Sequence, residues 1–235
     1  MMHEITSSQK ITMNFIVLLF ILFGIANGAQ NVCRFPKKWK SNYDFDYKKR
    51  QHEWATPNAK TDYYKLVLSW SPTFCKQLPS FNRNQTFQCQ YDDFGLVVHG
   101  FWAQSKNART LQQHPRNCRN VEQLPLMTVK RHFCMMPDES LIQAEWEKHG
   151  TCSFRSADEY LNTIEKVFTG LTIPNMKQIL RDKNIDHFKV KKALLEKNRS
   201  LRANQITVYM KGKDLIDIKI CYDLKFNFTP CPRSW

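Results

Sequence analysis

This sequence of 235 residues lacks several features that mark other classes of protein. It contains no internal repeat, no low-complexity tract and no linker-like stretch, which excludes repeat architectures and gives no reason to expect two folded domains. No Cys-x-x-Cys pair occurs, so the usual ligand spacing of a structural zinc site is absent. What remains, with 42% hydrophobic and 13% aromatic residues, is typical of one medium-sized globular domain.

Acidic residues are also scarce. The chain has 21 Asp and Glu residues against 35 Lys and Arg residues, which gives a formal net charge of +14. Such an excess increases solubility, and it also attracts polyanions such as nucleic acid or an anionic membrane. Composition alone leaves both interpretations open.

The sequence has no apolar run long enough for a comfortable membrane span. Its longest run, residues 15–25, has the length of the hydrophobic part of a signal peptide, with Lys10 before it and small residues at 26–28 after it. We therefore predict a signal peptide over residues 1–28 and a single domain over 29–235. The mature protein is then secreted, or lumenal, or periplasmic in a bacterium, without a stable membrane anchor.

All eight cysteines follow this segment. An even number in a secreted chain predicts up to four disulfides, but roughly a hundred pairings are possible and the sequence alone selects none. Three Asn-x-Ser/Thr sequons, at Asn84, Asn198 and Asn227, are candidates for glycosylation if the source is eukaryotic and the side chains lie on the surface.

The hydrophobic pattern predicts strands at both ends of the domain and helices between them, which indicates an α+β fold with a mainly antiparallel sheet. The basic and aromatic residues 34–50 are expected to form a surface arm or early loop, and a polar loop is expected between Cys75 and Cys89. The predicted strands are 64–70, 94–100, 205–209, 215–222 and 224–229, and the predicted helices are 140–149, 156–168, 175–183 and 189–197.

The stretch EWEKHGTC, residues 145–152, places several chemically active side chains close together. On a helix Glu145 and His149 are i,i+4 neighbours, and Lys148 lies three residues after Glu145. One helix face then carries a carboxylate, an ammonium group and an imidazole. The spacing by itself equally suits a solvated Glu–Lys pair beside an incidental histidine.

A second histidine, His99, ends the predicted strand 94–100. Alone it would be a satisfied core residue, but two histidines on separate rigid elements can act as a general base and a general acid. In a basic secreted protein this pair suits RNA cleavage. A neutral imidazole takes the proton of the ribose 2′-OH, a protonated one donates to the leaving 5′-oxygen, and a lysine stabilises the phosphorane-like charge without a metal.

Two segments carry a family resemblance. Residues 98–102 (VHGFW) and 145–152 (EWEKHGTC) resemble the active-site segments HGLWP and HEWEKHGTC of the ribonuclease T2 family. Residues 69–75, 136–143 and 218–221, with Cys231, resemble further parts of that family. Together these matches extend over roughly residues 62–232.

The resemblance implies an endoribonuclease that makes 2′,3′-cyclic phosphates and then 3′-phosphates from single-stranded RNA. By position, His149 is the general base and His99 the general acid, and Glu145 and Lys148 polarise or stabilise the phosphate. Trp102 belongs to a base-stacking site, in keeping with low base specificity. No metal or cofactor is implied, and we expect a monomer. The implied disulfides are Cys75–Cys89, Cys118–Cys152 and Cys221–Cys231, which leaves Cys33 with Cys134.

The chain departs from the family pattern at three positions. Ala144 stands where many members have a histidine that contacts phosphate, so phosphate binding or turnover is expected to be weaker. Phe101 replaces leucine and Ala103 replaces proline, which predicts a looser loop after Trp102.

Two alternative functions follow from the same residues. The first is a cationic RNA- or surface-binding protein that has lost catalysis, against which the retained residues His99, Glu145, Lys148 and His149 argue. The second is a metal site formed by His99, Glu145 and His149, which the adjacent Lys148 makes electrostatically unfavourable.

Overall fold

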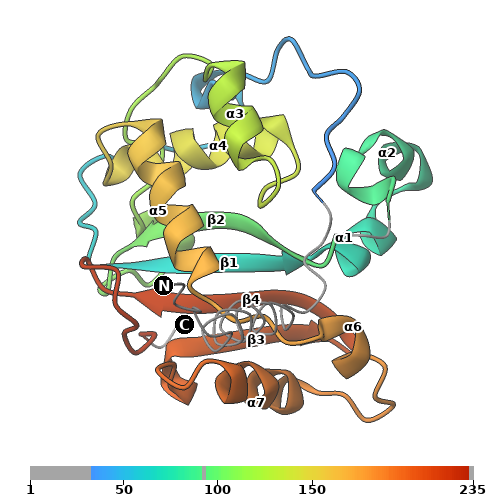
Figure 1. The fold of residues 1–235 in the computed structure, drawn as a ribbon. Coiled ribbons are helices and arrows are strands. Elements are labelled where there is room, and N and C mark those ends of the chain that lie inside the picture. Colours follow the sequence, from blue (N-terminus) through green and yellow to red (C-terminus); the bar gives the residue numbers. More distant parts are fainter. Residues whose placement is uncertain (1–32, 92–93, 233–235) are drawn as a thin grey trace, which may run out of the picture. The chain divides into compact units, whose positions relative to one another are not determined.

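An antiparallel sheet of four strands forms the centre of the domain (Figure 1). The computed structural model describes residues 33–91 and 94–232, so the predicted signal peptide lies outside the described residues. The strand order is β2-β1-β4-β3. The combination of this sheet with helices confirms the predicted α+β class. The strands are β1 (Tyr63–Trp70), β2 (Leu96–Gln104), β3 (Ile206–Lys211) and β4 (Asp214–Tyr222).

The two faces of the sheet carry different side chains, because residues alternate along each strand. Leu66 of β1 pairs with Phe101 of β2 and with Ile220 of β4, and all three are buried in the hydrophobic core. The next residue, Lys65, pairs with Trp102, so these two side chains project from the opposite face. We call this opposite side of the sheet the Trp102 face.

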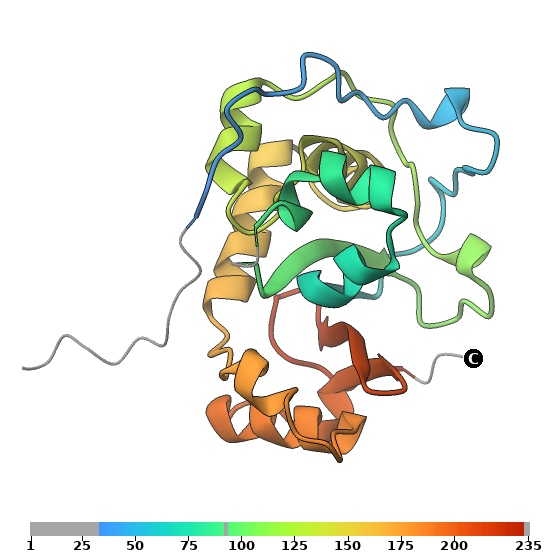
Figure 2. The ribbon, with the colours of Figure 1, turned by 90° about the vertical axis from the view of Figure 1, so that its right-hand side faces the viewer.

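The helices fall into three groups. In Figure 1, α3, α4 and α5 lie on the β2 side of the sheet, α6 and α7 lie near β3, and α1 and α2 follow the end of β1, where Figure 2 shows them facing the viewer. Among the described residues, no helix is long and apolar enough to cross a membrane. The helices are α1 (Ser71–Gln77), α2 (Ser80–Gln85), α3 (Leu126–His132), α4 (Glu139–Lys148), α5 (Ala157–Thr169), α6 (Met176–Ile179) and α7 (His187–Lys197).

Two local predictions are wrong. The region between Cys75 and Cys89 is not a simple polar loop, because it contains the end of α1 and the whole of α2. The region 34–50 is an early loop, as predicted, although Tyr43 within it is buried and its hydroxyl donates to the Leu124 carbonyl at 2.6 Å.

The predicted strand 224–229 is also absent, and only a single bridge joins Tyr222 to Phe228. The Asp223 carboxylate accepts the backbone N–H groups of Lys225 and Asn227, at 2.8 and 2.9 Å. These local bonds fold the chain into a turn, which competes with an extended strand.

The eight cysteines form four disulfides, and no cysteine is free. The pairs are the same as those that the family resemblance implies, including Cys33 with Cys134. The bond between Cys118 and Cys152 joins two segments that are 34 residues apart, directly behind α4. The disulfides are Cys33–Cys134, Cys75–Cys89, Cys118–Cys152 and Cys221–Cys231.

The three sequons differ in their surroundings. Asn84 and Asn227 are exposed, but Asn198 is only 8% exposed. Both hydrogens of the Asn198 amide are used, because Nδ2 donates to the carbonyls of Thr172 and Leu194 at 2.9 and 2.8 Å. A glycan would replace one of these hydrogens and would need space that the fold fills. The condition that the side chain lies on the surface is therefore met at Asn84 and Asn227 but not at Asn198 in the folded protein.

Candidate active site

His99 lies at an irregularity inside β2, not at the end of the strand as predicted. Val67 of β1 pairs with Gly100, whereas Leu68 pairs with Val98, so His99 is left without a partner in β1. An extra residue of this kind is a β-bulge, and bulges re-aim side chains next to active sites. The His99 side chain is 40% exposed.

The strand continues past the bulge and through Trp102 to Gln104. The looser loop predicted after Trp102 is therefore absent. Ala103 lies within the strand and is completely buried, so its small side chain belongs to the core and not to a loop. The hydroxyl of Tyr160 in α5 holds this part of β2, since it accepts from the Phe101 N–H at 3.2 Å and lies 3.3 Å from the Phe101 carbonyl.

Gly100 allows β2 and α4 to approach each other closely. A Cβ atom at this position would lie 1.8 Å from Oε2 of Glu145 and 2.7 Å from Nε1 of Trp102. Both distances are too short for any side chain. The glycine beside His99 is therefore required for the Glu145 carboxylate to reach the Trp102 face.

The helix α4 positions Glu145 and His149. Its first turn is capped by Asp138, whose side chain accepts the Leu141 N–H at 3.0 Å. Trp146 is buried and anchors the helix in the core. The helix ends at Lys148, and His149 follows as its C-cap, with its N–H bonded to the Glu145 carbonyl at 3.0 Å.

The Glu145 carboxylate lies between the two histidines. Its Oε1 is 3.7 Å from Nε2 of His99, and its Oε2 is 3.9 Å from Nε2 of His149. Trp102 donates its indole N–H to Oε2 at 2.7 Å. Burial raises the pKa of Glu145, although the charges of His99 and Lys148 oppose that rise. The structure thus brings together four of the five residues that the sequence singled out as a site.

The fifth, Lys148, has its ion pair elsewhere. Its Nζ lies 3.2 Å from Oε1 of Glu53 and 4.4 Å from the centre of the Phe45 ring. No ion pair joins Lys148 to Glu145 among the residues that the structure describes, although its charge still acts on both Glu145 and His149.

Sequence reasoning missed a second cation, Arg116. Its Nη1 lies 3.5 Å from Nε2 of His149. The other edge of the guanidinium donates to Glu53, from Nε and from Nη2, at 3.0 Å in both cases. Glu53 therefore holds Arg116 and Lys148 together beside His149, and it leaves Nη1 of Arg116 directed at the imidazole.

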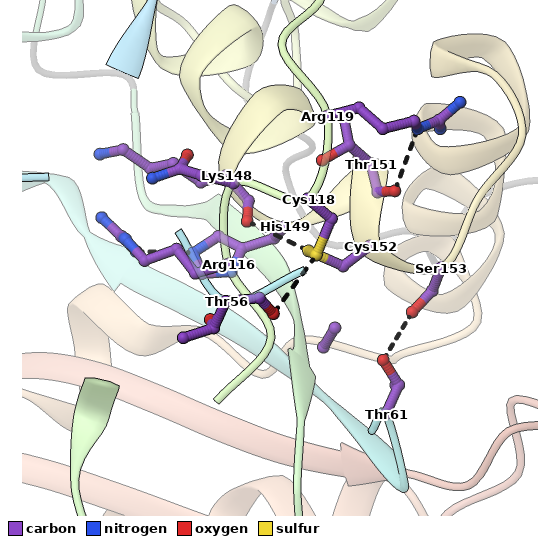
Figure 3. The surroundings of a disulfide bond; sticks show 12 residues. Thr56, Thr61, Arg116, Cys118, Arg119, Lys148, His149, Thr151, Cys152 and Ser153 are labelled. Atoms are coloured by element: carbon purple, nitrogen blue, oxygen red, sulfur yellow. Dashed lines mark hydrogen bonds between the residues drawn. A yellow bond between two sulfur atoms is a disulfide. The ribbon is translucent and has the colours of Figure 1, made fainter. Parts of the chain in front are cut away.

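The loop that carries Arg116 is attached to the end of α4 in two ways. The Asn117 N–H donates to the Lys148 carbonyl at 2.9 Å, and the next residue, Cys118, is bonded to Cys152. Figure 3 shows Arg116, Lys148 and His149 together on one side of this disulfide, with Arg119 on the other. The disulfide implied by the resemblance was the one signal that could have placed Arg116 near His149.

His149 is an electrostatically unusual histidine. Its side chain is 8% exposed, and its ring packs against Trp102 with the ring centres 5.3 Å apart. Burial, followed by the charges of Arg116 and Lys148, holds the pKa of His149 well below its ordinary value. His149 is therefore neutral at neutral pH and well into the acidic range, as a general base must be.

No metal-binding group accompanies this arrangement. Within residues 33–91 and 94–232, no three His, Cys, Asp or Glu side chains are placed so that they could hold a metal ion.

Ala144, at the position of the phosphate-contacting histidine, is 8% exposed and turned away from solvent. The titratable and charged groups at this end of α4 are two histidines, the carboxylates of Glu145 and Glu53, and two cations.

Comparisons with known proteins found relatives by sequence and solved structures of similar fold. A protein of Haemophilus influenzae described as a probable ribonuclease is 36% identical over 198 residues, which is 81% of this chain and 68% of that protein. An RNase-related protein from Calystegia sepium has a similar fold at 20% identity, with a TM-score of 0.56 over 75% of this chain and 93% of that one. RNase NT, solved with 5′-AMP, gives a TM-score of 0.55 at 19% identity, over the same shares of the two chains.

The model of the ribonuclease T2 family matches residues 61–231. This range contains β1, β2, α4 and both active-site segments, and it ends at the last disulfide-bonded cysteine. It covers well over half of the chain, and the relative from Haemophilus influenzae agrees with it. The chain belongs to the ribonuclease T2 family of endoribonucleases.

Proposed function

We propose that the protein is a secreted, metal-independent endoribonuclease that cleaves single-stranded RNA by transphosphorylation. It forms 2′,3′-cyclic phosphates and then hydrolyses them to 3′-phosphates. The observation that carries this proposal is the pair of histidines on either side of one buried carboxylate, 3.7 and 3.9 Å from its oxygens. Acid–base catalysis of this reaction needs one imidazole on each side of the scissile phosphorus.

His149 acts as the general base of the first step. Its lowered pKa keeps the ring neutral, so the imidazole has an unprotonated nitrogen that can take the proton of the ribose 2′-OH. The 2′-oxygen then forms a bond to phosphorus as the bond to the 5′-oxygen breaks. Glu145 faces the same nitrogen and favours the imidazolium that the proton transfer creates.

His99 acts as the general acid. It is more exposed than His149, and its Nε2 lies 3.7 Å from the other oxygen of Glu145. It donates its proton to the leaving 5′-oxygen. In the second step water attacks the cyclic phosphate and the two histidines exchange roles, because hydrolysis is the reverse of the same chemistry with water in place of the 5′-hydroxyl.

Arg116 and Lys148 stabilise the extra negative charge on the phosphorane-like transition state. Glu53 neutralises one of these two cations, so one net positive charge remains beside His149. Nη1 of Arg116 is the donor best placed for a non-bridging phosphate oxygen, because Glu53 occupies the opposite edge of the guanidinium. Arg116 thus supplies a phosphate contact in a chain that has Ala144 at the usual histidine position.

Trp102 supports a stacking site for a base of single-stranded RNA, since every base has a π-face and stacking tolerates any sequence. Low base specificity follows. The protein needs no cofactor for these steps, and we propose that it acts as a monomer.

Secretion follows from the N-terminal sequence and the disulfides. Residues 1–28 serve as a signal peptide in this proposal, and residues 29–235 form the single catalytic domain. Four disulfides support this assignment, since disulfides form and persist in oxidising compartments.

A digest of single-stranded RNA with the purified mature protein, with and without EDTA and across pH, tests the proposal. We expect the same cleavage rate with the chelator, 2′,3′-cyclic ends first and 3′-phosphate ends later. A strict requirement for metal, or products with 5′-phosphate ends, would contradict the mechanism. Binding of RNA without cleavage would instead support the alternative of a family member that has lost catalysis.

A further inference from the structure

Two lysines lie next to each other on the Trp102 face of the sheet. Lys65 of β1 pairs with Cys221 of β4, and two residues further along β1, Val67 pairs with Lys219. The two lysines are therefore diagonal neighbours across β1 and β4, and their long side chains project from the same face.

This arrangement is unfavourable for the protein alone. Burial, followed by the charge of Lys219, lowers the pKa of Lys65. Among the described residues neither ammonium group forms an ion pair, and each lies near an aromatic ring, Lys65 near Tyr63 and Lys219 near Trp102. The nearest carboxylate along β4 on this face, Asp217, accepts the Ser69 hydroxyl at 2.7 Å. Two cations held together without a carboxylate are the normal setting for an anionic ligand.

The lysine pair is connected to the active site through Trp102. Nζ of Lys219 lies 5.7 Å from the centre of the Trp102 ring, and the ring of His149 packs against that same indole. Lys65 lies opposite Trp102 in the β1–β2 register. Trp102 therefore separates two cationic groups, with Arg116 and Lys148 near His149 and the two lysines further across the sheet.

We propose that Lys65 and Lys219 form a second phosphate subsite, which binds the phosphodiester next to the scissile one. The inference rests on the proposed function and extends it. The nucleoside between the two phosphates stacks on Trp102, and the chain of RNA continues over the Trp102 face from β2 towards β4. The enzyme then prefers substrates with at least two phosphodiesters, because a dinucleoside monophosphate leaves the lysine pair empty.

The test measures kcat/KM of Lys65→Met, of Lys219→Met and of the double variant against the unaltered protein, on substrates of different length. Methionine keeps an apolar stem of similar length, which matters because Lys65 is half-buried. With a tetranucleotide we expect kcat/KM to fall on the order of tenfold through KM, about the value of one charge-assisted contact. With a dinucleoside monophosphate we expect no change. The dependence of log kcat/KM on log salt becomes shallower by about 0.7 with the tetranucleotide.

The matched control is Lys211→Met with Lys213→Met, which removes the same charge from the exposed β3–β4 turn. Three outcomes would overturn the subsite. They are an equal fall in kcat/KM in the control, an equal fall on both substrates, and no fall on the tetranucleotide. Thermal stability should stay level or rise, because a like-charge pair is removed, and Lys65→Arg with Lys219→Arg should retain the length preference. If the unaltered protein cleaves neither substrate, the proposed function fails and not the subsite alone.

Discussion

The two histidines of the active site come from very different surroundings. His99 lies at a bulge of an edge strand, with 40% of its side chain exposed and one carboxylate beside it. His149 ends a buried helix, with 8% exposed and two cations nearby. Two side chains of the same chemical type thus have different surroundings, and those of His149 lower its pKa. The environment, and not the residue type, separates the proposed base from the proposed acid.

The largest effect should come from removing either histidine. We expect His149→Ala and His99→Ala each to lower kcat on RNA by about 100-fold to 10,000-fold, the usual contribution of a general acid or base. The measurement is the initial rate of RNA cleavage at several pH values, with circular dichroism to check the fold. His187→Ala, an exposed histidine at the start of α7, serves as the control and should keep full activity. If either histidine variant stays folded and fully active, the assignment of His99 and His149 as the acid–base pair is wrong.

The contact between the two histidine-bearing elements gives the next largest effect. In Gly100→Ala the new Cβ collides with the Glu145 carboxylate, so α4 and β2 must move apart. We expect a loss of activity on the order of tenfold or more, and a free energy of unfolding lowered by about 1–3 kcal/mol, as for other overpacked sites. Gly170→Ala, at the end of α5, has no such close contact with the site and should leave kcat unchanged. Equal behaviour of the two variants would show that the close approach is not needed.

Arg116→Met should weaken the electrostatic difference between His149 and an ordinary histidine. Loss of this cation raises the pKa of His149 towards its ordinary value, because one of the charges that disfavour the imidazolium is gone. The acidic limb of the kcat/KM–pH profile then moves to higher pH, and kcat/KM at neutral pH falls on the order of tenfold through the lost phosphate contact.

Arg119→Met is the matched control for Arg116→Met. Arg119 lies in the same loop as Arg116, but it donates to the carbonyls of Thr151 and Phe154, on the other side of the disulfide. This variant should leave the pH profile in place even if it lowers the thermal stability. A profile that shifts equally in both variants would assign the effect to the loop and not to the Arg116 charge.

The smallest effect is expected at His132, a buried histidine that is not part of the active site. His132 of α3 is buried, both ring nitrogens lack a hydrogen-bond partner, and burial lowers its pKa although Glu165 opposes this. His132 therefore binds a proton more tightly in the unfolded protein than in the folded one. The folded protein has its full stability, as far as His132 is concerned, above the unfolded pKa of about 6.5. That stability is lost as the pH falls through the lower pKa of the folded state. In His132→Leu the melting temperature should gain most over the wild type at pH 5 and least at pH 8. A gain that does not depend on pH would contradict this account, and RNA cleavage should be unchanged.

The sequence predicted α4 and α5 well because their signals are local. Ile142 and Trp146, whose helical spacing predicted α4, are both buried in it, and Ser156 caps α5 by accepting the Glu159 N–H, as its capping-box pattern indicated. The bulge at His99 was not predictable, because it depends on how β2 is paired with β1 and not on its own alternation.

The cationic half of the site was not predictable either. Glu53 and Arg116 are 63 residues apart, and neither belongs to a local pattern that marks an ion pair. Their contact depends on the docking of two irregular segments against the end of α4, through Asn117 and the Cys118–Cys152 disulfide. Long-range packing of this kind leaves no periodicity in the sequence.

The position of Glu53 has a practical consequence for where this enzyme begins. The family match starts at residue 61, yet the carboxylate that holds Arg116 and Lys148 comes from eight residues before that point. A protein shortened to the matched region would keep both histidines and the whole EWEKHGTC stretch while its two cations lost their shared anchor. The functional boundary of the domain therefore lies upstream of the boundary drawn by similarity, and any minimal version of the enzyme should retain the segment that precedes β1.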